Sequence, residues 1–165
     1  MNREEILKEI KETKEHLANM EKMLKECKYE RWNPKQSEEY YCVDDGNDVR
    51  RVNFNIMNAY DRDRIKTYNC FRTKEEAEQE AEKILIRRQL EDIARRLNKD
   101  NKIDWDNGKQ FKYYICIDSR DNEIIWDREV RYISQGIVYC LDINFYNVAI
   151  KEIGEGRLIE YLRGK

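Results

Sequence analysis

The sequence has one histidine, one proline and six glycines among 165 residues. Catalysis by an activated serine or cysteine needs a base beside the nucleophile, most often a histidine. The single histidine, His16, falls on the solvent-facing flank of a predicted helix, away from any such nucleophile. The scarce glycines form neither a phosphate-binding loop nor a dinucleotide-binding fingerprint. The sequence therefore predicts no enzymatic activity and no cofactor.

Five cysteines are present, an odd number, and no two have the Cys-x-x-Cys spacing of a metal or redox site; they are Cys27, Cys42, Cys70, Cys116 and Cys140. This pattern argues against a disulfide framework and a zinc site, and favours reduced thiols in a cytoplasm. No apolar run reaches the length of a membrane span, and the N-terminus lacks the apolar core of a signal peptide. We therefore expect a cytoplasmic protein with no membrane partner.

Closely spaced carboxylates, the usual ligands of hard metal ions, occur only in or beside predicted turns, where Asp is favoured for backbone hydrogen bonding. The pairs are Asp44/Asp45, Asp61/Asp63 and Asp104/Asp106. The stretch from Asp104 to Gly108 resembles the start of a calcium loop, but its Gly comes one place early and no Glu closes it. We therefore expect no metal site.

Charged residues make up 40% of the chain, and 32 basic against 34 acidic residues leave a net charge of -2. Because the two signs nearly cancel, no global field attracts nucleic acid or a membrane surface. Hydrophobic residues make up another 40%. That is enough for a thin core in one compact domain with an appendage, or in two small domains.

Residues 3–28 are predicted to form one helix, because apolar or small residues recur at alternating spacings of three and four. A stripe only two residues wide is typical of a coiled coil, so residues 1–29 are predicted to join two copies in a homodimer. The expected dimer contacts are Ile6, Ile10, Leu17, Met20 and Leu24, with Thr13 and Cys27 on the same seam. The alternative is a helix packed across the protein's own sheet.

Residues 30–165 carry a pattern that occurs twice. Trp32 is followed eight and nine residues later by Tyr40-Tyr41, and Trp105 by Tyr113-Tyr114. Each tyrosine pair leads into β-prone sequence, a polar turn, more β-prone sequence and then a helical pattern. We therefore predict an α+β domain made of two strand-strand-strand-helix repeats, 30–98 and 99–165, with helices packed on antiparallel sheets. Chance alignment of aromatic strands is the alternative.

The helix that ends the first repeat has two features of its own. Thr73 and Glu76 form the pattern of a capping box at its start. Its apolar face also switches to nearly the opposite side near Arg87. The switch predicts either a break or a long bridging helix whose two halves pack against different partners. In the second repeat, a helix is expected from about Asp142 until the glycines at 154 and 156 interrupt it.

The strongest binding signal is the segment from Arg50 to Lys74, where arginines and lysines alternate with aromatic residues. The candidate partner-binding residues are Arg50, Arg51, Tyr60, Arg62, Arg64, Lys66 and Arg72. Arginine beside an aromatic ring suits phosphates and bases. The same combination anchors contacts to an acidic protein surface. The remaining alternative is a solvated outer face of a strand.

Three stretches together resemble a pattern in small phage and prophage proteins of low-GC Gram-positive bacteria. They are Trp32-Asn33-Pro34, Glu39-Tyr40-Tyr41 and Asn69-Cys70-Phe71-Arg72-Thr73-Lys74-Glu75-Glu76-Ala77-Glu78, and the ending 149–155 is similar as well. The likeness covers residues 30 to 163, with Ser37 and Tyr68 where the pattern has Gly. It implies a phage accessory protein in a host cytoplasm and carries no functional residues to this chain.

Three functions follow as hypotheses. The first is a non-enzymatic inhibitor of a host protein or ribonucleoprotein complex, such as an anti-CRISPR or another anti-defence protein. The second is a nucleic-acid-binding accessory protein that uses the segment from Arg50 to Lys74. The third is a sponge that captures a nucleotide signal between the repeats or between subunits.

Overall fold

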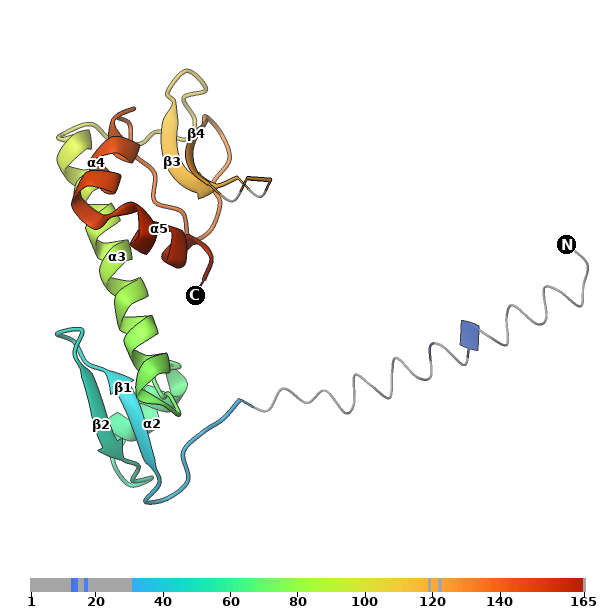
Figure 1. Cartoon of the computed structure of the whole chain (residues 1–165), viewed down its shortest axis with the longest axis vertical. Helices are drawn as coiled ribbons and strands as arrows, with labels where there is room; N and C mark the ends of the chain where they lie inside the picture. The colour runs from blue at the N-terminus through green and yellow to red at the C-terminus, as the bar shows by residue number, and fades with distance from the viewer. Residues whose placement is uncertain (1–12, 15–16, 18–30, 119, 122, 165) are drawn as a thin grey trace, which may run out of the picture. The chain divides into compact units, whose positions relative to one another are not determined.

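The computed structural model describes residues 13, 14, 17, 31–118, 120, 121 and 123–164, which fall into two units, 1–33 and 34–165 (Figure 1). In the first unit, Thr13, Lys14 and Leu17 are helical and exposed. The other predicted dimer contacts, Ile6, Ile10, Met20 and Leu24, lie outside the described residues. No described helix combines the length and the apolar character that crossing a membrane requires.

The second unit is organised around α3, a helix of 25 residues from Lys74 to Asn98 (Figure 1). It packs against β1 and β2 and also against α4 and α5, and its residues from Ile86 onward enter the apolar core with α4 and α5. The predicted capping box is confirmed, since the Thr73 hydroxyl accepts from the Glu76 amide and the Glu76 carboxylate accepts from the Thr73 amide. The switch of apolar face near Arg87 therefore marks a change of partner along one continuous helix.

The N-terminal lobe is built on the first half of α3. Strands β1 (Glu39–Val43) and β2 (Val49–Asn53) form an antiparallel hairpin in which Tyr41 pairs with Arg51. Helix α2 (Ala59–Lys66) follows, and the chain then returns to β1 through a single bridge between Tyr41 and Phe71. Two small residues of α3, Ala77 and Ala81, are buried in this lobe and let the hairpin lie close to the helix.

The C-terminal lobe contains the largest apolar core among the described residues. Strands β3 (Lys112–Ile117) and β4 (Ile124–Glu129) form a second antiparallel hairpin. Helices α4 (Phe145–Ile153) and α5 (Glu155–Leu162) cover one face of it, and α3 packs against these two helices. The core side chains come from all of these elements and include Ile86, Leu90, Ile93, Ile115, Ile124, Phe145, Ala149, Ile153 and Leu158. Gly154, with φ of 96°, separates the two helices as predicted, whereas Gly156, also predicted to interrupt the helix, lies within α5.

The other face of this hairpin is covered by two loops. Trp105 packs edge-on against Tyr139, with ring centroids 5.0 Å apart. Beneath them Lys112 is fully buried, and its ammonium group donates to the Val130 carbonyl at 2.8 Å and lies 5.1 Å from the Trp105 ring. Backbone carbonyls and an aromatic face thus replace water around this cation.

The structure confirms an α+β protein with helices packed on antiparallel sheets, but the predicted third strand of each half is wrong. The stretch 65–71 contributes the end of α2 and one bridge residue, and 136–141 contributes only the bridge between Tyr113 and Cys140. Asp61 and Asp63, expected in a turn, lie in α2. The duplication is not confirmed, because α2 has no counterpart in the second half and Tyr40 is fully buried whereas Tyr113 is not.

Candidate interaction site

The segment from Arg50 to Lys74 forms β2, α2 and the start of α3, and most of its basic side chains have acidic partners. Arg50 lies 2.5 Å from Asp44, and Arg51 pairs with Glu39 across the hairpin. The remaining pairs are Arg64 with Asp61, Lys66 with Asp63 and Lys74 with Glu78. The segment is therefore far less cationic than its own sequence indicates, because partners from β1, the β1–β2 turn and α3 offset its charge.

Asp61 is the buried residue of α2. Its side chain is 1% exposed, and it accepts hydrogen bonds from the Tyr40 hydroxyl at 2.7 Å and from the Arg64 guanidinium at 3.2 Å. Its second oxygen accepts from the Asn55 amide at 2.9 Å. Burial raises the pKa of Tyr40, so this hydroxyl stays protonated and donates to the carboxylate. The geometry favours a structural role for Arg64, one of the predicted contact residues.

Three exposed apolar side chains lie directly before and within α2. Ile56, Met57 and Tyr60 are 57%, 81% and 75% exposed, and all three fall within five residues of sequence. Isolated exposed apolar residues are common on protein surfaces, but a group of this kind marks interaction sites. We name residues 55–60 together with Arg62 the α2 tip.

The backbone of the α2 tip is held by side-chain acceptors. The Ile56 amide donates to Gln36, the Met57 amide to Asn55 at 3.0 Å and the Tyr60 amide to the N-cap residue Asn58 at 2.9 Å. The Asn55 amide donates to buried Asp61, and the guanidinium of Arg62 donates to the Ile56 carbonyl at 2.7 Å. The tip thus presents apolar side chains on an ordered backbone.

Of the predicted contact residues, the structure brings Tyr60 and Arg62 together at the tip. Arg50 and Arg51 lie on β2, exposed but paired, and Arg72 lies exposed just before α3. Sequence reasoning missed Ile56 and Met57, because an apolar pair after a strand is typical of the strand's own end. The available signal was the run of Asn residues at 53, 55 and 58, whose side chains cap turns and helices.

The C-terminal end of α2 places another aromatic residue on the surface. Tyr68 has φ of 64°, and the amides of Tyr68 and Asn69 donate to the carbonyls of Ile65 and Arg64 in a Schellman motif. Glycine is the usual residue at this position, since a side chain there costs about 1 kcal/mol or more. Ser37, the other position where the resemblance expects Gly, also has positive φ, at 66°. Both turns therefore keep the geometry that glycine favours.

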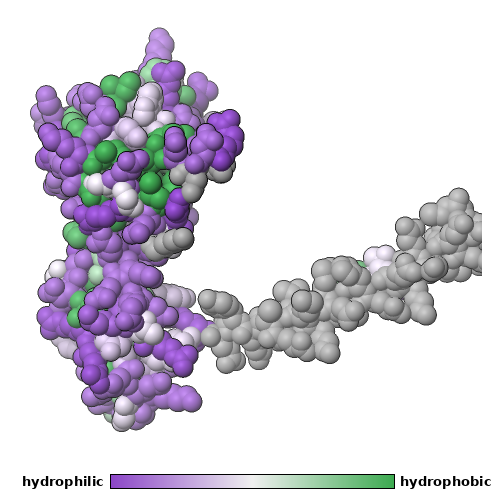
Figure 2. Space-filling model, in the orientation of Figure 1, coloured by the Kyte–Doolittle hydropathy of each residue, from purple (hydrophilic) through white to green (hydrophobic). Residues whose placement is uncertain are grey.

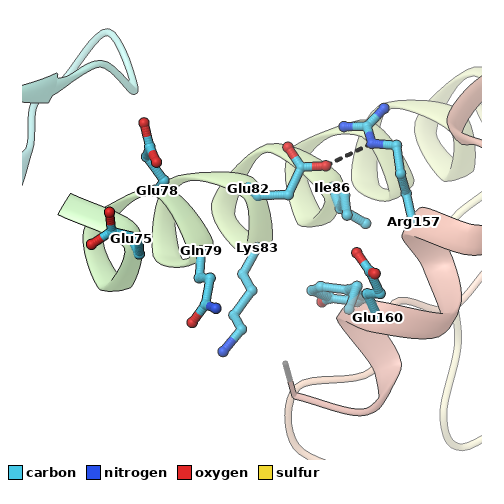
Figure 3. A pocket seen from close by; sticks show the side chains of 9 residues that line it. Glu75, Glu78, Gln79, Glu82, Lys83, Ile86, Arg157 and Glu160 are labelled. Carbon is cyan, nitrogen blue, oxygen red and sulfur yellow. Dashed lines mark hydrogen bonds and ion pairs between the residues drawn. The ribbon is translucent and has the colours of Figure 1, made fainter. Parts of the chain in front are cut away.

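A cavity of about 460 Å³ lies between α3 and α5 (Figure 3). Glu75, Glu78 and Glu82 of α3 line it together with Arg157 and Glu160 of α5. Glu82 pairs with the Arg157 guanidinium at 2.6 Å, and Lys83 donates to the Gly164 carbonyl at 3.0 Å. These links fix α5 against α3, so the cavity walls form part of the junction between the two helices.

The side-chain oxygens of Asp104 and Asn107 in the loop 104–108 accept hydrogen bonds from the loop's own backbone. Asp104 accepts from the Asp106 amide at 3.0 Å, and Asn107 accepts from the Lys109 amide at 3.0 Å. Asp44 is used in the same way in the β1–β2 turn, where hydrogen bonds from the Asp48 amide and from Arg50 lower the pKa of its carboxyl. Within the described ranges, no three His, Cys, Asp or Glu side chains are placed to hold a metal ion together.

Apolar side chains are distributed unevenly over the second unit. On the face drawn in Figure 2 they gather on the C-terminal lobe, whereas the N-terminal lobe is largely hydrophilic.

Comparison of the chain with protein-family models, with curated proteins and with solved structures gave no match.

Proposed function

We propose that this chain is a non-enzymatic interaction protein that binds and inhibits a host macromolecule through the α2 tip. The observation that carries the proposal is the exposure of Ile56, Met57 and Tyr60 on a backbone held by four side-chain acceptors. The resemblance to phage proteins supplies the context, an anti-defence protein such as an anti-CRISPR in the host cytoplasm.

An ordered apolar tip supports protein binding for an energetic reason. Binding immobilises side chains and loops, at about 0.5–1.5 kcal/mol for each flexible side chain, and a loop already fixed avoids much of that cost. Tyr and Arg are enriched among the residues that dominate interface energy, and Met is enriched in interfaces generally. Tyr60, Met57 and Arg62 supply all three residue types within one short stretch.

The same geometry makes nucleic acid the weaker alternative. A protein that binds nucleic acid without sequence preference gains affinity by neutralising phosphates with free cations. Here Arg50, Arg51, Arg64 and Lys66 already neutralise carboxylates of the chain itself. Phosphates would have to compete with those carboxylates, so a partner with an apolar pocket fits the α2 tip better.

Capture from a host lysate with matched variants tests the site. We expect the wild-type chain to retain a host protein that Met57→Glu loses by about 30-fold or more, since hot-spot changes cost at least about 2 kcal/mol. Ile133→Glu is the control, because Ile133 is an apolar residue of the C-terminal lobe that is 65% exposed. Retention by Met57→Glu, or loss only with Ile133→Glu, would place the contact elsewhere.

We also propose that the N-terminal segment makes the protein a homodimer through its heptad seam. Light scattering is expected to give twice the chain mass of 20.2 kDa. Leu17→Asp should give 20.2 kDa, because a charge at a core position of a short coiled coil is not tolerated. Lys14→Asp, off the seam, should remain dimeric. A wild-type chain that scatters as a monomer at micromolar concentration would contradict the coiled coil.

A further inference from the structure

A second cavity, of about 280 Å³, lies in the N-terminal lobe between the β1–β2 turn, the end of α2 and one face of α3. We name it the turn–helix cavity. Its volume is close to the lower end of the range for small-molecule sites, about 300 Å³. It does not include the α2 tip, and neither the junction of α3 with α5 nor the proposed protein contact uses it.

The turn–helix cavity has an apolar floor and an aromatic wall. Val43, Phe71 and Ile84 supply the floor, and Tyr68, which is 71% exposed, stands beside it. Hydrogen bonds hold the backbone at Tyr68 and at the residue that follows it. The Schellman motif holds its backbone, and the side chain of the next residue, Asn69, bonds both the amide and the carbonyl of Val43, at 2.8 and 2.6 Å. A flat ring that packs on the floor would therefore meet an aromatic side chain whose backbone is already ordered.

Charged groups of opposite sign stand at the two ends of the cavity along α3. Glu80, Ile84 and Arg88 follow one another at intervals of four residues, so they share one face of the helix and span about 12 Å. Asp44 and Asp45, from the β1–β2 turn, add two more carboxylates to the lining, of which Asp44 pairs with Arg50. Asp45, Glu80 and Arg88 form no ion pair with another residue in the described part of the chain, unlike Arg50 and Arg51 of β2 and Arg64 and Lys66 of α2. The lining therefore suits a ligand that is flat, that donates hydrogen bonds at one end and that is anionic at the other.

We propose that the turn–helix cavity binds a guanine nucleotide. Stacking on the aromatic wall and apolar floor accommodates any base. A carboxylate selects guanine, because the ring N1–H and the exocyclic amino group of guanine are adjacent donors that match the two oxygens of Glu80 or Asp45. Arg88 provides the planar donor group that binds phosphate oxygens in pairs. A guanine nucleotide thus offers a base to the aromatic wall and apolar floor, donors to the carboxylates and a phosphate to Arg88.

Thermal unfolding and calorimetry of the full chain test the assignment, with GMP, AMP, guanosine and inorganic phosphate as the four probes. We expect GMP to bind with a dissociation constant below about 1 mM. At a hundredfold excess over that constant, it should raise the melting temperature by about 5 °C or more. AMP and guanosine should each bind at least about tenfold more weakly, since each lacks one of the two polar matches. Inorganic phosphate alone should give no shift.

Three variants locate the site. Glu80→Gln should remove the preference for GMP over AMP, and Arg88→Gln should reduce GMP to the affinity of guanosine. Tyr68→Gly should melt at a higher temperature than the wild type, because it relieves the left-handed side chain, yet bind GMP about tenfold more weakly. Loss of binding in a more stable variant cannot come from misfolding. Arg87→Gln, adjacent to Arg88 but outside the lining, is the matched control and should bind as the wild type does.

The outcomes that overturn the proposal are equally specific. The first is that GMP shows no saturable binding at concentrations up to about 10 mM, tenfold above the expected limit of the dissociation constant. The second is equal affinity for all four probes. The third is an affinity for GMP that neither Arg88→Gln nor Tyr68→Gly changes. None of these results bears on capture of a protein by the α2 tip, because Met57 and Tyr60 lie outside the turn–helix cavity.

Discussion

Replacing Asp61 with alanine is expected to lower the free energy of unfolding by about 3–5 kcal/mol. The change removes one carboxylate that accepts from Tyr40, Arg64 and the Asn55 amide, and it leaves all three donors without their acceptor. The half-buried Arg64 guanidinium loses its counter-ion and the buried Tyr40 hydroxyl loses its acceptor, and both losses contribute to the cost. Urea unfolding followed by far-UV circular dichroism measures it.

Asp63→Ala is the matched control for this prediction. Asp63 lies two residues further along α2, its side chain is 68% exposed, and it pairs only with Lys66 at 3.5 Å. Its loss should change stability by no more than about 0.5 kcal/mol. Tyr40→Phe should be intermediate, at about 1–2 kcal/mol, because one of the three bonds to Asp61 is lost. Equal stability of Asp61→Ala and Asp63→Ala would show that the buried carboxylate does not hold α2.

The effect of Asp61 also connects the fold with the proposed function. The Asn55 amide, which Asp61 binds, begins the chain of hydrogen bonds that orders the α2 tip. Under conditions where Asp61→Ala still folds, the tip is expected to lose part of its order and therefore part of its affinity for a protein partner. The buried carboxylate thus acts on the surface through the backbone, without contacting a partner itself.

Helix α3 could be predicted from the sequence because its signals are local and agree with one another. Thr73 and Glu76 mark its start, and its apolar residues follow a helical period on each side of Arg87. Even the change of packing partner was visible, since a stripe that moves to the opposite face needs a second surface. A helix with a standard cap and a clear periodicity depends little on the rest of the chain.

Helix α2 could not be predicted, and its composition gives the reason. Asp61 is its buried residue, so it has no apolar stripe for a periodicity argument to detect. What holds it is an ion pair and a hydrogen bond to Tyr40, which lies 21 residues earlier. The paired state of Arg50 and Arg51 was hidden for the same reason. Their partners, Asp44 and Glu39, come from a neighbouring strand and turn, outside the segment in which the basic residues were counted.

The turn–helix cavity shows a different limit of sequence reasoning. The third hypothesis from the sequence places a nucleotide site between the repeats or between subunits, whereas the turn–helix cavity lies within one lobe. Its charged ends are visible in the sequence only after α3 is known to present Glu80 and Arg88 on one face toward the β1–β2 turn. The sequence shows a tyrosine at position 68, but only its φ of 64° shows that this side chain stands in a left-handed turn.

Arg87→Pro is expected to make the two lobes unfold at different denaturant concentrations. The Arg87 side chain is 53% exposed, so its replacement acts mainly on the backbone. Proline in a helix interior removes one hydrogen bond and clashes with the preceding turn, at a cost of about 3 kcal/mol or more. The large apolar core lies entirely in the C-terminal lobe and draws its α3 residues from Ile86 onward. That lobe should therefore keep its structure at denaturant concentrations at which the N-terminal lobe has already unfolded.

Two probes of the same urea titration measure this separation. In a Trp32→Phe background, the remaining tryptophans, Trp105 and Trp126, report on the C-terminal lobe by fluorescence, whereas far-UV circular dichroism reports on the whole chain. We expect the two curves to coincide for the wild type and for Arg87→Ala, and to diverge for Arg87→Pro, with an early loss of circular dichroism. Coincident curves for Arg87→Pro would mean that contacts other than α3 join the lobes. In that case the α2 tip and the turn–helix cavity would be supported by the C-terminal core directly, because the N-terminal lobe has no apolar cluster of comparable size among the described residues.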